Sequence, residues 1–111
     1  MNGEKLTKKS QEALSNAHAV AVELNHQELQ PVHLVAALIR QQDGLIPSLL
    51  KKLDVSVIDA EASVAALLRK IPVVTGAGVQ THMSRSLTAV LQDAERKASQ
   101  MKDEYVSVEH L

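Results

Sequence analysis

The sequence has no cysteine, tryptophan or phenylalanine, and Tyr105 is its single aromatic residue. Without cysteine, disulfide bonds, thiol catalysis and cysteine-ligated zinc are excluded. One aromatic residue cannot form the stacking platforms that bind single-stranded nucleic acids or the cages that hold methylated amines. The core must therefore be built from Leu, Val, Ile and Ala.

The sequence also lacks an excess of charge of one sign and long apolar runs. Lys and Arg number 12 and Asp and Glu 13, which gives a net charge of −1. A nucleic-acid surface usually needs a concentrated basic stripe. No apolar run approaches the roughly 20 residues that span a bilayer, and residues 1–5 do not resemble a secretory signal. We therefore predict one domain of 111 residues, with a cytoplasmic location and no contact with nucleic acid or membrane.

Motifs for catalysis and for phosphate binding are missing. The Gly-Ala-Gly of residues 76–78 matches neither the dinucleotide-binding nor the P-loop pattern. No nucleophile elbow surrounds any serine. The five histidines show no metal-ligand spacing; they are His18, His26, His33, His82 and His110. We predict no catalytic and no metal-binding residue, and a structural role for His33 and His110.

A shift of 77 residues places residues 6–34 on residues 83–111 without a gap. Five of the 29 aligned positions are identical, and the others mostly keep the residue class. The identical pairs are Leu14 with Leu91, Ala17 with Ala94, Ala21 with Ala98, His33 with His110 and Leu34 with Leu111. Such self-similarity indicates a tandem repeat. A second copy as long as the first would run to about residue 147, so we expect the chain to be a fragment.

Hydrophobic periodicity predicts helices over residues 7–25, 31–41, 47–53, 56–70 and 84–102, with a sixth helix beginning after Ser107. Thr7 and Ser84 are expected N-caps, and Ser56 with Asp59 forms a capping-box-like pair. These elements divide the chain into a first repeat over about 6–70, a flexible linker over 71–82 and a partial second repeat over 83–111. The expected core positions are Leu6, Ala13, Leu14, Ala17, Ala21 and Leu24, then Leu34, Val35, Leu38 and Ile39, then Leu49, Leu50 and Leu53, then Ile58, Ala62, Ala65 and Leu67 or Leu68, then Leu87, Val90 or Leu91, Ala94, Ala98 and Met101.

Carboxylates gather where the fifth helix turns into the sixth. Asp103 and Glu104 lie in that corner, and Glu109 lies in the first turn of the sixth helix. The cluster has two interpretations. It is either a solvated turn with a glutamate that stabilises the helix dipole, or part of a binding site.

Several segments resemble the N-terminal domain of Clp ATPases, and most of all the ClpB disaggregase branch. They are Glu4-Lys5-Leu6-Thr7, residues 30–38 (Gln-Pro-Val-His-Leu-Val-Ala-Ala-Leu), residues 45–50 (Leu-Ile-Pro-Ser-Leu-Leu) and residues 102–111. The resemblance implies an all-α, pseudo-twofold domain made of a tandem four-helix motif, here with its second copy incomplete.

The resemblance also implies a function. Such a domain binds unfolded or aggregated polypeptides and delivers them to a hexameric AAA+ ring. It carries no enzyme activity and no cofactor, because ATP and magnesium belong to separate AAA+ modules. Its peptide-binding residues correspond to Thr7, Asp103 and Glu109. Carboxylates at this site favour segments that also carry Lys or Arg. Asp93 and Lys97 depart from the family, since leucines can occur at both positions.

Other functions remain open to test. The same fold serves as an adaptor-docking module in protease-associated ClpA and ClpC ATPases. A small DNA-binding protein would need a basic helix, and an enzyme would need a catalytic constellation. In this family the fifth helix packs on helices that this chain lacks, so we expect Leu87, Leu91 and Met101 to be uncovered. We therefore predict either self-association or disorder beyond about residue 72.

Overall fold

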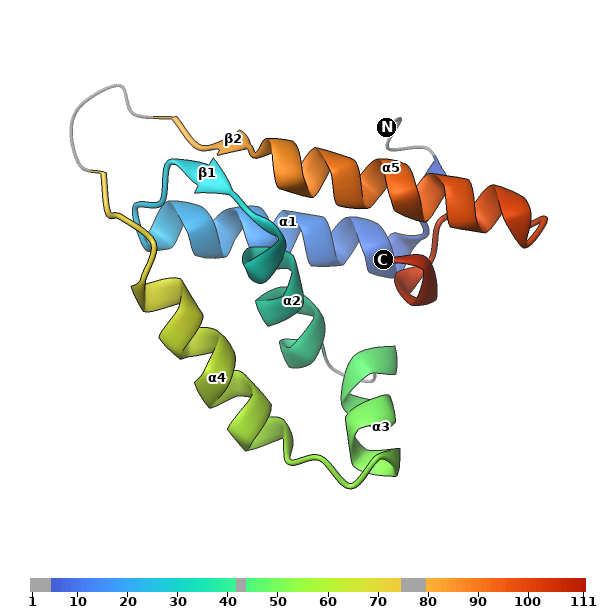
Figure 1. Ribbon diagram of the computed structural model, residues 1–111, viewed down its shortest axis with the longest axis horizontal. Coiled ribbons are helices and arrows are strands. Elements are labelled where there is room, and N and C mark those ends of the chain that lie inside the picture. The colour runs from blue at the N-terminus through green and yellow to red at the C-terminus, as the bar shows by residue number, and fades with distance from the viewer. Residues whose placement is uncertain (1–4, 42–43, 75–79) are drawn as a thin grey trace.

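The computed structural model describes residues 5–41, 44–74 and 80–111, and its regular structure is almost entirely helical (Figure 1). In chain order the elements are α1 (Lys8–Glu23), β1 (Glu28–Leu29), α2 (Pro31–Arg40), α3 (Leu45–Lys52), α4 (Val57–Arg69), β2 (His82–Met83), α5 (Arg85–Gln100) and the short 3-10 helix η2 (Val108–His110). The all-α prediction is confirmed. Within the described ranges no helix is long and apolar enough to cross a membrane.

The two long helices, α1 and α5, run antiparallel and are equivalent under the shift of 77 residues (Figure 1). Each has 16 residues, and their first and last positions differ by that shift. Each is followed by one residue in the left-handed region, Asn25 with φ 57° and Lys102 with φ 59°. The next amide donates back into the last turn, from His26 to Ala21 and from Asp103 to Ala98, both at 2.8 Å. These are matching Schellman-type helix ends, so the repeat extends to backbone geometry.

Short parallel strand pairings join the two copies of the repeat to each other. β1 pairs in parallel with β2, with Leu29 opposite Met83, and Leu6 bridges Val106 in the same sense. The shift converts one pairing into the other, because 6 and 29 become 83 and 106. Each helix-opening segment is therefore held by the segment that leaves the other long helix.

Three predicted N-caps are confirmed. The hydroxyls of Thr7, Ser56 and Ser84 accept from backbone amides three residues on. The predicted start of the third helix at Pro47 is wrong, since α3 begins at Leu45. Proline is tolerated there because amides of the first turn have no intrahelical partner.

Small residues line the buried face of α1, whose most extensive helix contact is with α2. Ala13, Ala17 and Ala21 of α1 share a buried cluster with Leu87 and Leu91 of α5. The expectation that Leu87 and Leu91 would be uncovered is wrong, because α1 and α2 cover them. The described residues 80–111 pack on this core through α5 and η2.

Several apolar residues that were expected in the core are exposed. α4 packs on α2 through Val64 and Leu68, which places the rest of its predicted face in solvent, and α3 has few neighbours. Helix-end positions also project outward, because the chain turns away there. The exposed positions are Leu24, Val35, Leu49, Leu53, Ile58, Ala62 and Met101. Of the alternatives Leu67 and Leu68, the buried residue is Leu68.

The segment after α4 lies against residues 25–29. Val73 bridges His26, and the Val74 amide donates to the Asn25 carbonyl at 2.8 Å. The described ends of the predicted linker are thus tied to the first repeat rather than extended freely. Its glycines, Gly76 and Gly78, lie outside the described residues, as do Asp43 and Glu4. The division into repeats and linker stays a prediction.

Candidate functional site

A hollow of about 410 Å³ lies between the start of α1, the corner before α3 and η2. Its lining brings together Thr7 and Glu109, two of the three residues predicted from the sequence. Asp103, the third, does not line it. The described residues that line it are Thr7, Lys8, Lys9, Gln41, Gly44, Leu45, Ser107, Val108 and Glu109.

Backbone pairing brings these distant segments together. The Thr7 amide donates to the Val106 carbonyl at 3.0 Å, and the Val106 amide donates to the Lys5 carbonyl at 2.6 Å. Leu6 and Val106 are buried with alanines of α5, which anchors both segments to the core. The hollow is therefore built by the crosswise contact between the two repeats.

Thr7 keeps its structural role in this position. Its hydroxyl accepts from the Ser10 amide at 3.3 Å and donates to the Ser10 hydroxyl at 3.1 Å. The side chain is half-buried at the edge of the hollow. A hydroxyl oxygen has a second lone pair, so capping does not prevent Thr7 from accepting one further hydrogen bond.

Glu109 supplies the negative charge of the hollow. Hydrogen bonds from the Ser107 hydroxyl and from the backbone amide of Glu109 itself hold the pKa of this exposed carboxyl below its ordinary value. Burial opposes this shift, and His110 adds to it. The group is therefore ionised near neutral pH, at the opening of η2 where amides point outward.

Asp103 acts behind the hollow as a positioning residue. Its Oδ2 lies 2.9 Å from Nε2 of His110, whose side chain is 1% exposed against 43% for Asp103. The Ser107 amide donates to Nδ1 of His110 at 3.0 Å. A neutral imidazole that accepts at Nδ1 must carry its proton on Nε2, so His110 donates to Asp103. This pair holds η2, and with it Glu109, against the end of α5.

Sequence reasoning missed two kinds of residue here. Lys8 and Lys9 are exposed, follow Thr7 directly and line the hollow, but were not among the predicted site residues. The buried Gln41 was not predicted as a site residue, because it follows the end of α2 and belongs to no motif in the sequence. Its side-chain amide donates to the Lys9 carbonyl at 2.9 Å and ties the wall to α1.

In the other repeat the positions equivalent to Thr7, Asp103 and Glu109 carry no carboxylate, and the nearby Glu28 faces His82 at 3.8 Å instead. The shift of 77 residues places Ser84, His26 and Val32 opposite Thr7, Asp103 and Glu109. There His26 Nδ1 lies 2.8 Å from His33 Nε2, and the Gln30 amide donates to His33 Nδ1 at 2.9 Å. The structural role predicted for His33 and His110 is therefore confirmed, and carboxylates occupy these equivalent positions in one repeat.

The departures noted in α5 lie on its outer face. Asp93 and Lys97 are both exposed, and Asp93 forms an ion pair with Arg96 at 3.1 Å. The apolar part of the hollow comes instead from Leu45 and Val108.

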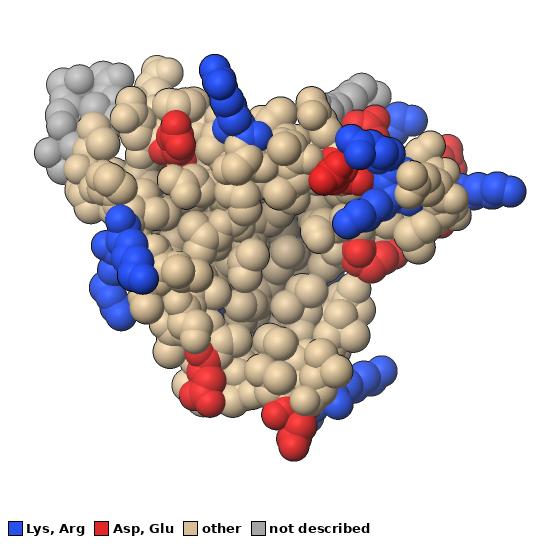
Figure 2. Space-filling model, viewed as in Figure 1, with Lys and Arg blue, Asp and Glu red and all other residues tan. Residues whose placement is uncertain are grey.

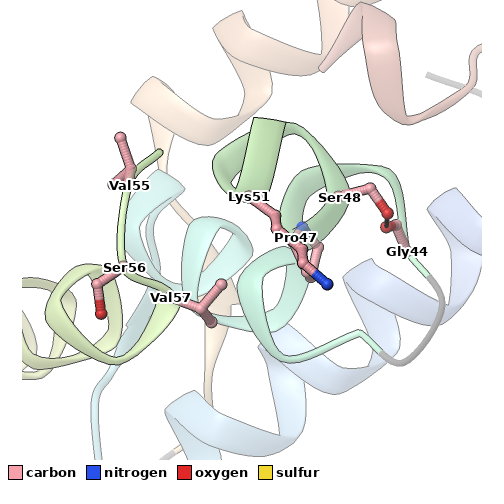
Figure 3. A pocket seen from close by; sticks show the side chains of 7 residues that line it. All are labelled: Gly44, Pro47, Ser48, Lys51, Val55, Ser56 and Val57. Atoms are coloured by element: carbon pink, nitrogen blue, oxygen red, sulfur yellow. Dashed lines mark hydrogen bonds between the residues drawn. The ribbon is translucent and has the colours of Figure 1, made fainter. Parts of the chain in front are cut away.

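Another hollow of about 480 Å³ lies between α3 and the start of α4 (Figure 3). Its hydroxyls serve the backbone: Ser48 donates to the Gly44 carbonyl at 3.2 Å, and Ser56 accepts from the Asp59 amide at 3.3 Å. Among the described residues that line it, Lys51 carries the charge. Over the ranges that the structure describes, no three His, Asp or Glu side chains gather where a metal ion could bind.

Comparison with known proteins matches the chain to one family. The family model described as the Clp repeat (R) N-terminal domain covers residues 5–111. The chaperone protein ClpB of Clostridium tetani is 40% identical over 100% of this chain and 13% of its own length. That of Nitratidesulfovibrio vulgaris is 45% identical over 96% of this chain and 13% of its length. The Hsp104 N-terminal domain from Candida albicans is 28% identical, with a TM-score of 0.86 over 96% of this chain and 69% of that one.

Proposed function

The chain belongs to the Clp repeat (R) N-terminal domain family, and from this we propose that it is the substrate-binding and regulatory module of a ClpB-like protein disaggregase. It contacts unfolded or aggregated polypeptides at the hollow that Thr7 and Glu109 line. The matched family is an N-terminal domain and not an ATPase module, so these residues provide recognition rather than catalysis.

The observation that carries this proposal is the juxtaposition of Glu109 with apolar walls. Leu45 and Val108 provide apolar surface, while Thr7 and Glu109 provide polar groups at the rim. A shallow apolar surface with a polar rim suits a partner whose sequence varies. Lys8 and Lys9 also line the hollow, so the preference of the Glu109 carboxylate for a Lys or Arg beside aliphatic residues is confined to its own edge of the hollow.

The wider role rests on the relatives. The chain spans about 13% of the length of the ClpB proteins it matches. We propose that it works in the cytoplasm beside a hexameric AAA+ ring whose own modules bind ATP and magnesium. Six weak sites on one ring would bind an extended client far more tightly than one site does.

Backbone amide NMR shifts test the site directly. We expect an unstructured Leu-rich peptide that carries two lysines to shift the amides of Thr7, Val108 and Glu109. Glu109→Gln should weaken binding about threefold, the scale of one exposed charge pair. Glu104→Gln is the matched control, because Glu104 is an exposed carboxyl that does not line the hollow.

Two results would overturn the proposal. One is an equal loss of affinity in Glu109→Gln and Glu104→Gln, since the hollow would then play no special part. The other is no shift with unfolded peptides together with tight binding of one folded protein, which would support the adaptor-docking function instead.

A further inference from the structure

A separate hollow of about 360 Å³ lies at the other end of α1, between α2, α4 and the segment after α4. It shares no lining residue with the Thr7–Glu109 hollow. Its lining comes from four parts of the chain and comprises Leu24, His26, Arg40, Ala65, Leu68, Arg69, Ile71 and Val73.

The hollow has an aliphatic surface that is already formed. Leu24 and Val73 are exposed at its edge, whereas Leu68 is buried beneath. The wall is fixed by backbone pairing, because His26 bridges Val73 and the Val74 amide donates to the Asn25 carbonyl at 2.8 Å. A ligand therefore meets a preorganised apolar surface, which reduces the entropic cost of binding.

The charge of this hollow is positive only. Arg40 and Arg69 line it, and none of the other lining residues is acidic. Over the described part of the chain, neither guanidinium forms an ion pair or hydrogen bond. Figure 2 shows Lys and Arg side chains over the C-terminal end of α4 without Asp or Glu directly beside them. Lys70 follows Arg69 and adds to this charge.

His26 does not supply a further cation. Burial lowers the pKa of His26 below its ordinary value, and its Nδ1 faces His33 Nε2 at 2.8 Å. A protonated Nδ1 would place two N–H groups against each other there. The two arginines are therefore the groups that define the charge preference of the hollow.

We propose that this hollow is a second docking surface, whose partner is an extended aliphatic polypeptide segment that carries an Asp or Glu side chain. Guanidinium groups bind carboxylates in a bidentate manner, and an aliphatic neighbour of that carboxylate fits the Leu24–Val73 edge. The Thr7–Glu109 hollow carries a carboxylate together with Lys8 and Lys9, whereas the charged groups that line this hollow are arginines. This inference does not depend on the function proposed for Glu109.

The test uses three 12-residue unstructured peptides of the same Leu/Ala content that differ only in two positions, which hold Glu, Gln or Lys. Backbone amide shifts on the complete chain report where each peptide binds. We expect the Glu peptide to shift residues 24, 65–69 and 71–73, and Arg40→Gln/Arg69→Gln to weaken its binding about tenfold. The same double variant should leave binding of the Lys peptide at Glu109 unchanged.

Lys52→Gln/Arg85→Gln is the matched control, because it removes two exposed positive charges that line neither hollow. Arg69→Glu should shift the preference of this hollow toward the Lys peptide. The proposal is overturned if the Glu and Gln peptides bind equally, if shifts from the Glu peptide fall outside this hollow, or if the control weakens binding as much as the arginine variant. Because the Lys peptide is followed at Glu109 in the same samples, failure of one site is distinguished from failure of the other.

Discussion

Two histidines in equivalent positions, His33 and His110, each receive a backbone amide at Nδ1 but face different partners at Nε2. His33 faces the imidazole of His26, whereas His110 faces the carboxylate of Asp103. At His33 the facing His26 ring must stay neutral, because two N–H groups would otherwise meet. The equivalent histidines of the two repeats are therefore held by different chemistry at Nε2.

The His26–His33 pair predicts a loss of stability in mild acid. Burial lowers the pKa of both groups below 6.5 in the folded chain, and His26 adds to the effect on His33. The unfolded state therefore binds more protons below pH 6.5, and the free energy of unfolding falls as pH drops from about 6.5 through the lowered pKa values. Urea unfolding at pH 7.5, 6.5 and 5.5 measures this.

An exposed histidine provides the control for this pH dependence. His18→Gln should keep the whole effect, because His18 is exposed on α1. His26→Gln should reduce the slope with pH even where it lowers stability at every pH. A slope that is unchanged in His26→Gln would contradict the role of this pair. The stabilisation that comes from ionised Glu109 is lost at a lower pH, below 4.5, because the pKa of that carboxyl is lowered in the folded chain.

The Asp103–His110 contact predicts a measurable cost of substitution. Asp103→Ala leaves the buried Nε2 of His110 without its carboxylate partner, and we expect about 1 kcal/mol of destabilisation. Amide shifts in η2 should change, because that pair holds η2 to the end of α5. Glu104→Ala, in the same turn and fully exposed, should alter neither quantity. An equal effect in the two variants would show that the contact has no structural importance.

Among the elements, the contact between α1 and α5 depends on alanine. Ala13, Ala17 and Ala21 are almost completely buried where the leucines of α5 pack. Small side chains leave room for these leucines, and a larger one would displace them. The apolar spacing along each helix predicted these two buried faces, since the same spacing recurs 77 residues later.

Ala17→Leu tests the packing of that interface. An added isobutyl group in a filled site should destabilise the chain by about 1–3 kcal/mol. Ala19→Leu is the control, since Ala19 is an exposed residue of the same helix and should change stability little. Thermal unfolding of both variants gives the comparison, and equal midpoints would contradict the close packing.

On the scale of the whole molecule, the corner from the end of α3 to the first turn of α4 leaves apolar side chains in solvent. Leu53 is 70% exposed and Ile58 is 78% exposed. Exposed apolar surface of this kind favours association. The prediction of self-association therefore moves from α5, whose leucines are covered, to this corner.

Sedimentation velocity at increasing concentration tests that association. We expect the sedimentation coefficient to rise with concentration in the unmodified chain and to stay constant in Leu53→Glu/Ile58→Glu. Val22→Glu/Val35→Glu introduces the same charge at exposed positions of α1 and α2 and should still associate. Association that survives in the corner variant would place the contact elsewhere.

The local features of the sequence determined the repeat, the helices and most caps. Periodicity and cap chemistry depend on a few neighbouring residues, so Thr7, Ser56 and Ser84 could be placed without knowledge of the fold. The resemblance to Clp N-terminal domains also led to the all-α architecture. It named Thr7, Asp103 and Glu109, two of which line one hollow in the structure.

Only the tertiary structure decided which surfaces are covered and which segments meet. The contact of Lys5–Thr7 with Val106 depends on how the repeats cross, and no local pattern encodes it. The positions of Leu24 and Ile58 in solvent follow from which helices pack on α4 and on the end of α1. The Arg40–Arg69 hollow likewise combines segments that are far apart along the chain. Helix formation is local, whereas burial and site assembly depend on long-range contacts, and for that reason the sequence alone determined the elements but not their surfaces.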